Sequence, residues 1–417
     1  MAKEEKKAPK LRFNGYTNDW EQVKLEKIAT FSKGKGYSKL DLKRKGYPIF
    51  LYGQMYTDYR YKIVETSTYA ILKEDAVVSN GNEIVIPSSG ETSVDIARAS
   101  WIAQKGIILG SDLNIIRPTS SVYPLFLALS LSNNQVKYNL AKVAQGNSIV
   151  HLYNNNLKKV NIYFPNIVEQ NKIGNILNSI SNCINLHERK CEELTLIKKA
   201  LLQKLFPKKE EVRPEVRYKN FSDAWEQRKL GEVMDVGSVK RIHQSDWKTE
   251  GVRFLRARDI VSFSKNEKPS DLLYIDNSKY NEYSKISGKV QKGDLLVTGV
   301  GSIGVPMLIK SDDPIYFKDG NIIWFKNNNS LNGNFFYYSF TSNKIQNFIR
   351  KSSGAGTVGT YTIDNGKKTP ILIPKDIDEQ EKVGKFLSRF DALITLHQRK
   401  LEKLKQLKKF LLQNMFI

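Results

Sequence analysis

Apolar side chains recur every three to four residues along two long stretches of this chain, residues 169–206 and 379–416. A seam that repeats every seven residues is typical of helices that pack on another helix with nearly aligned axes. The pattern therefore predicts two long helices. The seam positions are Ile173, Leu177, Ile180, Ile184, His187, Leu194 and Leu201 in the first stretch, and Val383, Leu387, Phe390, Ile394, His397, Leu401, Leu404 and Leu411 in the second.

The two stretches are copies of each other. They align without a gap at an offset of 210 residues, and 18 of the 38 aligned positions are identical. Each copy starts with a helix-capping signal, which is Asn166-x-x-Glu169 in the first and Asp376-x-x-Glu379 in the second. The chain is therefore a tandem duplication, and its two helices can pair with each other without a second chain.

Each half also opens with a related segment. Residues 12–25 are echoed by residues 217–230, and both contain the pattern Trp-Glu-Gln-x-Lys-Leu. Between this opening and the helix, short β-rich runs alternate with polar turns, and a helix is expected after Pro124 and over residues 335–350. The mixture predicts an α/β fold with one small α/β domain in each half. The β-rich runs are residues 47–52, 76–79, 84–86, 114–116 and 160–164, then 252–255, 294–298, 307–309, 321–325 and 371–373.

These patterns divide the chain into five parts. A charged, proline-bracketed segment separates the two halves and is interpreted as a linker. The predicted parts are a globular domain at residues 1–165, a helix at 166–206, the linker at 207–216, a second globular domain at 217–375 and a second helix at 376–417.

Charge narrows the function. The formal net charge is +23 and the pI is near 9.6, and such an excess attracts polyanions, of which nucleic acid is the commonest. Acidic proteins and membrane surfaces remain alternatives. Two cysteines indicate a reducing compartment, the first twelve residues contain no apolar core, and no apolar run is long enough to span a membrane. We expect a soluble, cytoplasmic protein with no membrane partner.

Basic residues mixed with glycines and aromatic residues occur early in both halves. Lys and Arg neutralise phosphate, and Arg can also reach the O6 and N7 atoms of guanine. Most of these residues taken singly are as well explained by a solvated surface, but the set favours binding to DNA or RNA. The candidates are Lys33, Lys35, Tyr37, Lys39, Arg44 and Arg60 in the first half, and Lys240, Arg241, Arg253, Arg256, Arg258 and Lys351 in the second.

Two stretches match a dinucleotide-binding fingerprint, residues 299–304 and 354–359. The fingerprint requires a helix to begin at the glycines, so that its N-terminal N–H groups face the pyrophosphate. A proline and a β-rich run follow the first stretch, and Thr-Tyr-Thr-Ile follows the second. Both are therefore interpreted as turns, and no cofactor site is predicted.

A few residues have spacings that are compatible with a metal site or a nuclease site. Cys183, His187 and Cys191 have a ligand-like spacing, but the copy has leucines in place of both cysteines, which indicates small core residues. His187 and His397 are either polar seam residues that fix helix register or half-solvated edge residues. Asp235, Asp246 and Lys248 loosely fit a metal-dependent nuclease. No convincing catalytic or metal-binding set is predicted.

The whole arrangement resembles the specificity (S) subunit of Type I restriction-modification systems. The resemblance covers the chain from about residue 12, and its most specific parts are the repeated Glu-Gln at the helix starts and Leu-Leu-Gln near the helix ends, at 169–170, 379–380, 201–203 and 411–413. It implies two target recognition domains, each reading one half of an asymmetric, interrupted duplex DNA sequence. It also implies that the helices form an antiparallel intramolecular coiled coil, which holds the domains apart and binds the partners.

The resemblance further implies a non-catalytic chain that carries no cofactor. Two modification (M) subunits would carry S-adenosylmethionine and methylate adenine, and restriction (R) subunits would carry ATP and Mg²⁺ and cleave DNA. The alternative from another class is a stand-alone metal-dependent DNA endonuclease that uses Asp235, Asp246 and Lys248. A coiled-coil protein that binds acidic proteins is a third interpretation.

Overall fold

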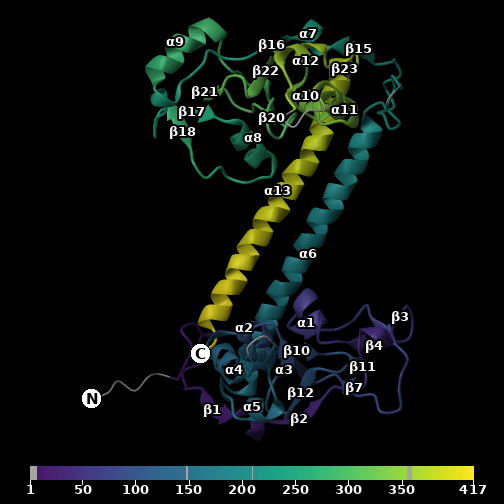
Figure 1. Ribbon diagram of the computed structural model, residues 1–417, viewed down its shortest axis with the longest axis vertical. Helices are drawn as coiled ribbons and strands as arrows, with labels where there is room; N and C mark the ends of the chain where they lie inside the picture. Colours follow the sequence, from purple (N-terminus) through teal and green to yellow (C-terminus); the bar gives the residue numbers. More distant parts are fainter. Residues whose placement is uncertain (1–6, 147–148, 209, 355–358) are drawn as a thin grey trace. The chain divides into compact units, whose positions relative to one another are not determined.

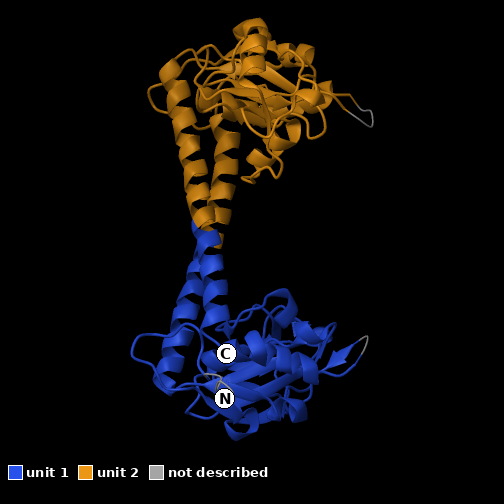
Figure 2. Cartoon of the chain, turned by 90° about the vertical axis from the view of Figure 1, so that its left-hand side faces the viewer, with its two compact units in different colours: residues 1–187, 400–417 blue, residues 188–399 orange. Residues whose placement is uncertain are grey.

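The structure, a computed structural model, describes residues 7–146, 149–208, 210–354 and 359–417. The chain forms two compact units (Figures 1 and 2). Unit 1 contains residues 1–187 and 400–417, and unit 2 contains residues 188–399. The unit boundaries pass through both long helices, so each unit holds the start of one helix and the end of the other.

The two predicted long helices are present. They are α6 (Ile167–Leu205) and α13 (Ile377–Asn414). In unit 1 the start of α6 packs against the end of α13, and in unit 2 the start of α13 packs against the end of α6. The two segments are therefore antiparallel within each unit. Every predicted seam position is buried or half-buried, as expected for the apolar stripe of a paired helix.

The α/β part of unit 1 contains two five-stranded mixed sheets. The first has the order β2 (Ala29–Lys33), β12 (Leu113–Pro118), β8 (Glu83–Pro87), β10 (Ser100–Ile102) and β5 (Lys62–Ile63). The second has the order β3 (Leu42–Lys43), β6 (Tyr69–Ala70), β4 (Tyr47–Phe50), β11 (Lys105–Leu109) and β7 (Val78–Asn80).

Helices cover the first of these sheets. Residues from β8 and β12 share one core with apolar side chains of α3 (Pro124–Leu131) and α4 (Asn134–Val143). The helix predicted after Pro124 begins there because proline is well placed at the first helical position. Shorter elements of unit 1 are η1 (Leu25–Lys27), η2 (Lys39–Asp41), α1 (Gln54–Thr57), β9 (Ser89–Gly90), α2 (Ser93–Ile96), β13 (Val150–His151) and α5 (Asn154–Lys158).

The α/β part of unit 2 has smaller sheets. One has the order β16 (Asp235–Gly237), β22 (Ile322–Lys326), β19 (Leu295–Thr298) and β20 (Pro306–Leu308), and the other β18 (Leu273–Ile275), β17 (Val252–Leu255) and β21 (Ile315–Phe317). The helices of this part are α7 (Leu230–Val233), η3 (Gln244–Asp246), α8 (Ala257–Ser264), α9 (Asn277–Ser287), α10 (Gly333–Phe340), α11 (Asn343–Ser352) and α12 (Ile363–Lys368).

Two predictions for unit 2, a helix over residues 335–350 and a turn at residues 299–304, can be compared with the structure. The single helix expected over residues 335–350 is two helices, α10 and α11, because α10 ends before Thr341 and α11 starts anew after Ser342. Residues 299–304 form the turn between β19 and β20, in which the N–H of Gly304 donates to the carbonyl of Thr298. This agrees with the turn predicted there. Of the second glycine-rich stretch, residues 355–358 lie outside the described residues.

A two-stranded antiparallel ladder ties each α/β part to the duplicated frame. We use this term for α6, α13 and the two opening segments, residues 12–25 and 217–230. In unit 1 the opening segment supplies β1 (Glu21–Lys24), which pairs with β14 (Asn161–Phe164) just before α6. In unit 2 β15 (Glu226–Lys229) pairs with β23 (Pro370–Ile373) just before α13. In each unit, the chain therefore enters the α/β part next to the point where it leaves it.

Candidate nucleic-acid interface

The start of each long helix is held by a buried ion pair to the opening segment. Arg12 donates from Nε and Nη2 to the Glu169 carboxylate at 2.8 and 2.7 Å, and Arg217 does the same to Glu379 at 2.7 and 2.8 Å. The remaining Nη1 group of each arginine donates to a carbonyl of the opening segment, that of Asn18 in unit 1. Two parallel bonds fix the orientation as well as the distance. The hydrogen bond to Glu169 raises the pKa of Arg12 further.

The glutamine after each glutamate fastens the helix to the α/β part. The Oε1 of Gln170 accepts from the N–H of Tyr123 at 2.9 Å, and the Oε1 of Gln380 accepts from the N–H of Asn332 at 3.0 Å. Each Nε2 donates to the carbonyl of the proline before the helix, Pro165 in unit 1 at 2.8 Å. The Glu-Gln pair therefore joins three segments in each unit.

The end of the opposite helix completes this arrangement, which we call the joint of each unit. In unit 1 Phe126 lies between Trp20 and Phe416, with ring centroids 5.6 and 5.4 Å away. In unit 2 Phe335 lies 5.5 Å from Trp225 and 5.6 Å from Phe206. The end of each repeat thus packs on the opening segment of the other repeat, a contact that was not predicted from the sequence.

Among the candidate residues of unit 1, Tyr37 must be reassigned. Its side chain is 2% exposed. Its hydroxyl donates to the carbonyl of Ile71 and accepts from the N–H of Lys73. It is a core residue, and burial excludes the proposed direct contact with DNA. Sequence proximity to lysines and glycines suggested the opposite, because the pattern does not report which way a ring points.

The basic candidates of unit 1 are at the surface. Lys35 forms an exposed ion pair with Asp75 at 3.0 Å and Arg60 forms one with Asp58, while Lys39, in η2, and Arg44 are exposed. Ion pairs of this exposed kind are weak, so these cations remain available to other anions.

Lys33 is grouped with aromatic residues from a distant segment. Its Nζ lies 5.6 Å from the ring centroid of Tyr153, and His151 stacks on the same ring at 6.0 Å. The Nδ2 of Asn154 donates to the carbonyl of Ser32, which ties this segment to β2. A half-exposed aromatic ring next to an exposed ammonium can contact both base and phosphate. Of this group only Lys33 was predicted, because 120 residues separate it from Tyr153 in the sequence.

In unit 2 two arginine candidates have structural roles. Arg253 donates from Nη1 to the carbonyls of Phe254 and Leu273, and burial lowers its pKa. Arg256 donates from Nε and Nη2 to the buried carboxylate of Asp259 at 3.2 and 3.1 Å. Their side chains are 18% and 14% exposed. We therefore no longer expect these two arginines to contact DNA.

The other candidates of unit 2 are exposed. Lys240 lies over the ring of Tyr283, in α9, at 4.1 Å, and Lys279 approaches the same ring at 5.6 Å. Arg241 forms a largely exposed ion pair with Asp319, Arg258 one with Asp271, and Lys351 is exposed near the end of α11. The two cations at Tyr283 resemble in kind the group at Tyr153 of unit 1, although the surrounding folds differ.

Two of the three residues of the nuclease alternative, Asp246 and Lys248, have ion-pair partners, and Asp235 is exposed at the start of β16. Asp246 accepts from Lys279 Nζ at 2.5 Å, which lowers the pKa of the carboxyl, and Lys248 lies 3.8 Å from Asp276. Within the described part of the chain, no group of three or more His, Cys, Asp or Glu side chains could hold a metal ion. Cys183 is exposed, so its interpretation as a core residue was wrong, and Cys191 is half-buried on the seam.

Comparisons with known proteins bear on what these units are. A family model, Type I restriction modification DNA specificity domain, matches residues 17–196 and again residues 222–406. The chain belongs to this family. The two matches correspond to the two repeats, and membership identifies the chain as a specificity subunit, which is a non-catalytic DNA-recognition component. No finding supports the endonuclease alternative.

Curated relatives of this chain match either nearly all of it or a part of it. It is 24% identical to the Type I restriction enzyme MjaVIII specificity subunit of Methanocaldococcus jannaschii, over 94% of this chain and 90% of the relative. A putative type I restriction enzyme specificity subunit of Haemophilus influenzae, S.HindORF215P, is 32% identical over 39% of this chain and 40% of its own length.

A solved structure shares the fold. The crystal structure of a Type-I restriction-modification system S subunit from M. genitalium superposes with a TM-score of 0.66 at 17% identity, and covers 98% of this chain and 99% of that one. The likeness confirms the predicted α/β architecture with its tandem repeat. Across the described residues, no helix is long and apolar enough to cross a membrane.

Proposed function

We propose that each unit of this specificity subunit reads one half of an interrupted, asymmetric duplex DNA sequence, while the duplicated frame binds one methyltransferase (M) subunit per unit. One contrast carries the proposal. The joints of the two units are built from the same residues and nearly the same bonds, whereas the α/β parts have different sheets. A partner that binds twice requires the same surface twice, and two different half-sites require two different readers.

The exposed cation and aromatic groups are the candidate contacts to DNA. Lys33 beside Tyr153 in unit 1, and Lys240 beside Tyr283 in unit 2, lie on the divergent parts of the chain. Lysine contacts to phosphate supply affinity that does not depend on sequence, and half-site preference requires additional contacts to base edges. Lys35, Lys39, Arg44, Arg60, Arg241, Arg258 and Lys351 are further candidates for phosphate contact.

The partners supply the chemistry. In this arrangement the M subunits bind S-adenosylmethionine and methylate adenine, and restriction subunits use ATP and Mg²⁺ to cleave DNA in the full complex. This chain contributes recognition and positioning. It would therefore act in the cytoplasm, wherever the partners and the DNA are together.

Exchange of one α/β part tests the proposal. Residues 26–165 are replaced by the corresponding part of another specificity subunit, and the adenine methylation pattern of cells that carry the hybrid is sequenced. We expect one half of the methylated sequence to change and the other half to stay. A change in both halves would contradict one reader per unit. Native mass spectrometry of the purified complex should show two M subunits per chain.

A further inference from the structure

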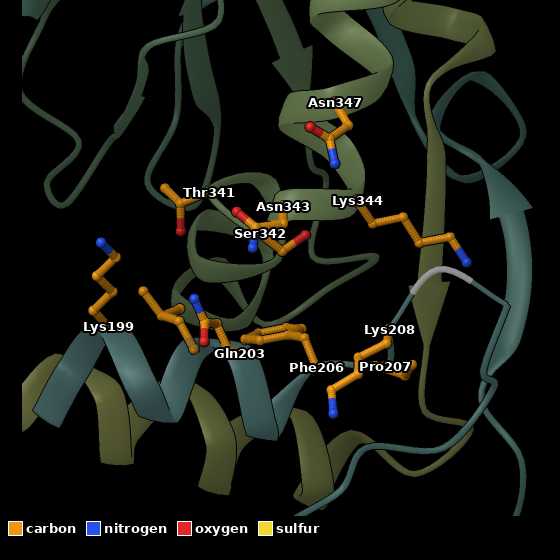
Figure 3. A pocket seen from close by; sticks show the side chains of 11 residues that line it. Lys199, Gln203, Phe206, Pro207, Lys208, Thr341, Ser342, Asn343, Lys344 and Asn347 are labelled. Carbon is orange, nitrogen blue, oxygen red and sulfur yellow. The ribbon is translucent and has the colours of Figure 1, made fainter.

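A cavity of about 520 Å³ opens in unit 2 where the end of α6 meets the turn between α10 and α11 (Figure 3). Its apolar lining comes from the last turn of α6 and the two residues after it, namely Leu202, Phe206 and Pro207. Carboxamide groups reach the space between α6 and α11 from both sides, from Gln203 on α6 and from Asn343 and Asn347 on α11. Carboxamides both donate and accept hydrogen bonds, so this lining suits an extended main chain with an apolar side chain.

The charged residues around the cavity are all of one sign. Lys199, Lys208 and Lys344 line it, and no carboxylate is among the described residues that do so. Lys344 is half-buried, burial lowers its pKa, and its Nζ donates to the neutral Oε1 of Gln227 at 3.2 Å. A partly desolvated ammonium is stabilised by an anionic partner, so the cavity favours an occupant that carries a negative charge.

The counterpart in unit 1 is different. Counting from Phe126 and Phe335, which occupy the same place in the two joints, Gln135 stands where unit 2 has Lys344, and Tyr138 stands where it has Asn347. In addition, the Nδ2 of Asn134 donates to the carbonyls of Leu412 and Phe416 at 3.2 and 3.0 Å, so that side chain lies against the helix end. The helical side of the site is repeated, as in Lys199 and Lys409, but on the α/β side the neutral Gln135 stands in place of the charged Lys344.

We infer that the cavity of unit 2 receives an acidic, extended segment of one M subunit, so that the two M subunits dock on this chain unequally. The inference rests on the proposed function, which places these partners on the repeated frame. Four of the cavity residues belong to that frame and recur in the other copy, namely Lys199, Leu202, Gln203 and Phe206. The shape argues against a DNA phosphate, because the three lysine side chains point in different directions instead of converging and the lining is largely apolar.

A matched pair of variants of the full-length chain tests the inference. The test variant carries Lys199→Glu with Lys344→Met, and the control carries the equivalent changes in unit 1, Lys409→Glu with Gln135→Met. Each is titrated with purified M subunit of the same system and followed by calorimetry and native mass spectrometry. We expect the test variant to lose at least tenfold in affinity at one of its two sites, while the control changes by less than twofold. Lys199→Glu alone, at an exposed helical position, serves if the double variant does not fold.

The outcomes separate the inference from the proposed function. Equal losses in test and control, or no loss in the test variant, would overturn the unequal docking but leave two M subunits per chain. A wild-type chain that binds no M subunit would overturn both. If instead the test variant binds M normally but loses affinity for a 40-base-pair duplex, with a shallower dependence on salt, the cavity is a phosphate site and the inference is wrong.

Discussion

The two units use the same joint but differ at one buried group. In unit 2 the indole N–H of Trp225 donates to the Oε1 of Glu379 at 3.2 Å, so this carboxylate serves both Arg217 and Trp225. In unit 1 the indole N–H of Trp20 is buried and has no hydrogen-bond partner among the described residues, although Glu169 is bound to Arg12 in the same way. The ion pair and the aromatic stack have been retained in both copies, and the additional hydrogen bond only in one.

The joints also show that a repeat is not a folding unit here. The backbone N–H of Leu11 donates to the carbonyl of Asn414, and the N–H of Val216 donates to that of Lys204. Unit 1 therefore takes the end of α13, from residue 400 onwards, from the second repeat, and unit 2 takes the end of α6, from residue 188 onwards, from the first. Corresponding residues therefore hold the two repeats together twice, once in unit 1 and once in unit 2.

Removal of the shared carboxylates should have the largest effect. Glu169→Ala and Glu379→Ala each leave an arginine with little exposure and no counter-charge, which costs about 3–5 kcal/mol. Glu379→Ala should be the more damaging, because Trp225 loses its acceptor as well. Hydrogen exchange with mass spectrometry can measure the opening free energy of each unit separately.

The control for this comparison is Lys385→Ala, which changes an exposed position on α13, the helix that carries Glu379. It should leave the opening free energies of both units nearly unchanged. If Glu169→Ala and Glu379→Ala opened both units to the same extent, the joints would not act as separate fastenings.

Tryptophan substitutions isolate the single hydrogen bond that distinguishes the units. Trp225→Phe and Trp20→Phe remove similar volume from similar aromatic stacks, so the loss of packing is common to both. Trp225→Phe also breaks the bond to Glu379 and should cost about 1–2 kcal/mol more than Trp20→Phe. Equal costs in chemical unfolding would show that the bond of Trp225 contributes nothing.

The helical frame was predictable because its signals are local. The seven-residue seam and the capping residues report on neighbours within a few turns of the same helix, and comparison of the two copies strengthened each assignment. The joints were not predictable, because Phe416 and Trp20 lie almost a full chain length apart. Only Trp-Glu-Gln and the terminal Phe, repeated in both halves, indicated that these ends matter, without showing that they meet.

The candidate interface was predictable in residue type but not in orientation. Lys33 and Lys240 are exposed, whereas Tyr37, Arg253 and Arg256 are engaged by the fold. The difference depends on hydrogen-bond partners contributed by other strands and loops, such as the carbonyls of Ile71 and Leu273. A short sequence window contains no information about those partners, so glycine and lysine spacing alone could not separate readers from core residues.

Lysine substitutions in the α/β parts extend the comparison to DNA. Lys33→Ala and Lys240→Ala should each weaken binding of the assembled methyltransferase to duplex DNA by a few-fold and reduce the slope of log K against log salt by about one. Lys385→Ala, which removes an exposed cation of α13 outside both α/β parts, is the matched control and should change the slope less. Fluorescence anisotropy at several salt concentrations gives both quantities. An unchanged slope for Lys33→Ala would remove the group at Tyr153 from the interface.

The smallest expected effect is a change in the acid dependence of one segment of unit 1, the segment around η2. Hydrogen bonds from Lys73 and from the backbone N–H of Ser38 lower the pKa of Asp41 to about 2. Because this folded-state pKa lies below the unfolded value of about 3.9, the stabilisation is present above pH 4 and is lost as the pH falls towards 2. Lys73→Met should therefore flatten the acid dependence of hydrogen exchange around η2. The exchange rates of unit 2 should stay as they are, and the effect should be slight, because both partners are exposed to solvent and to screening by salt.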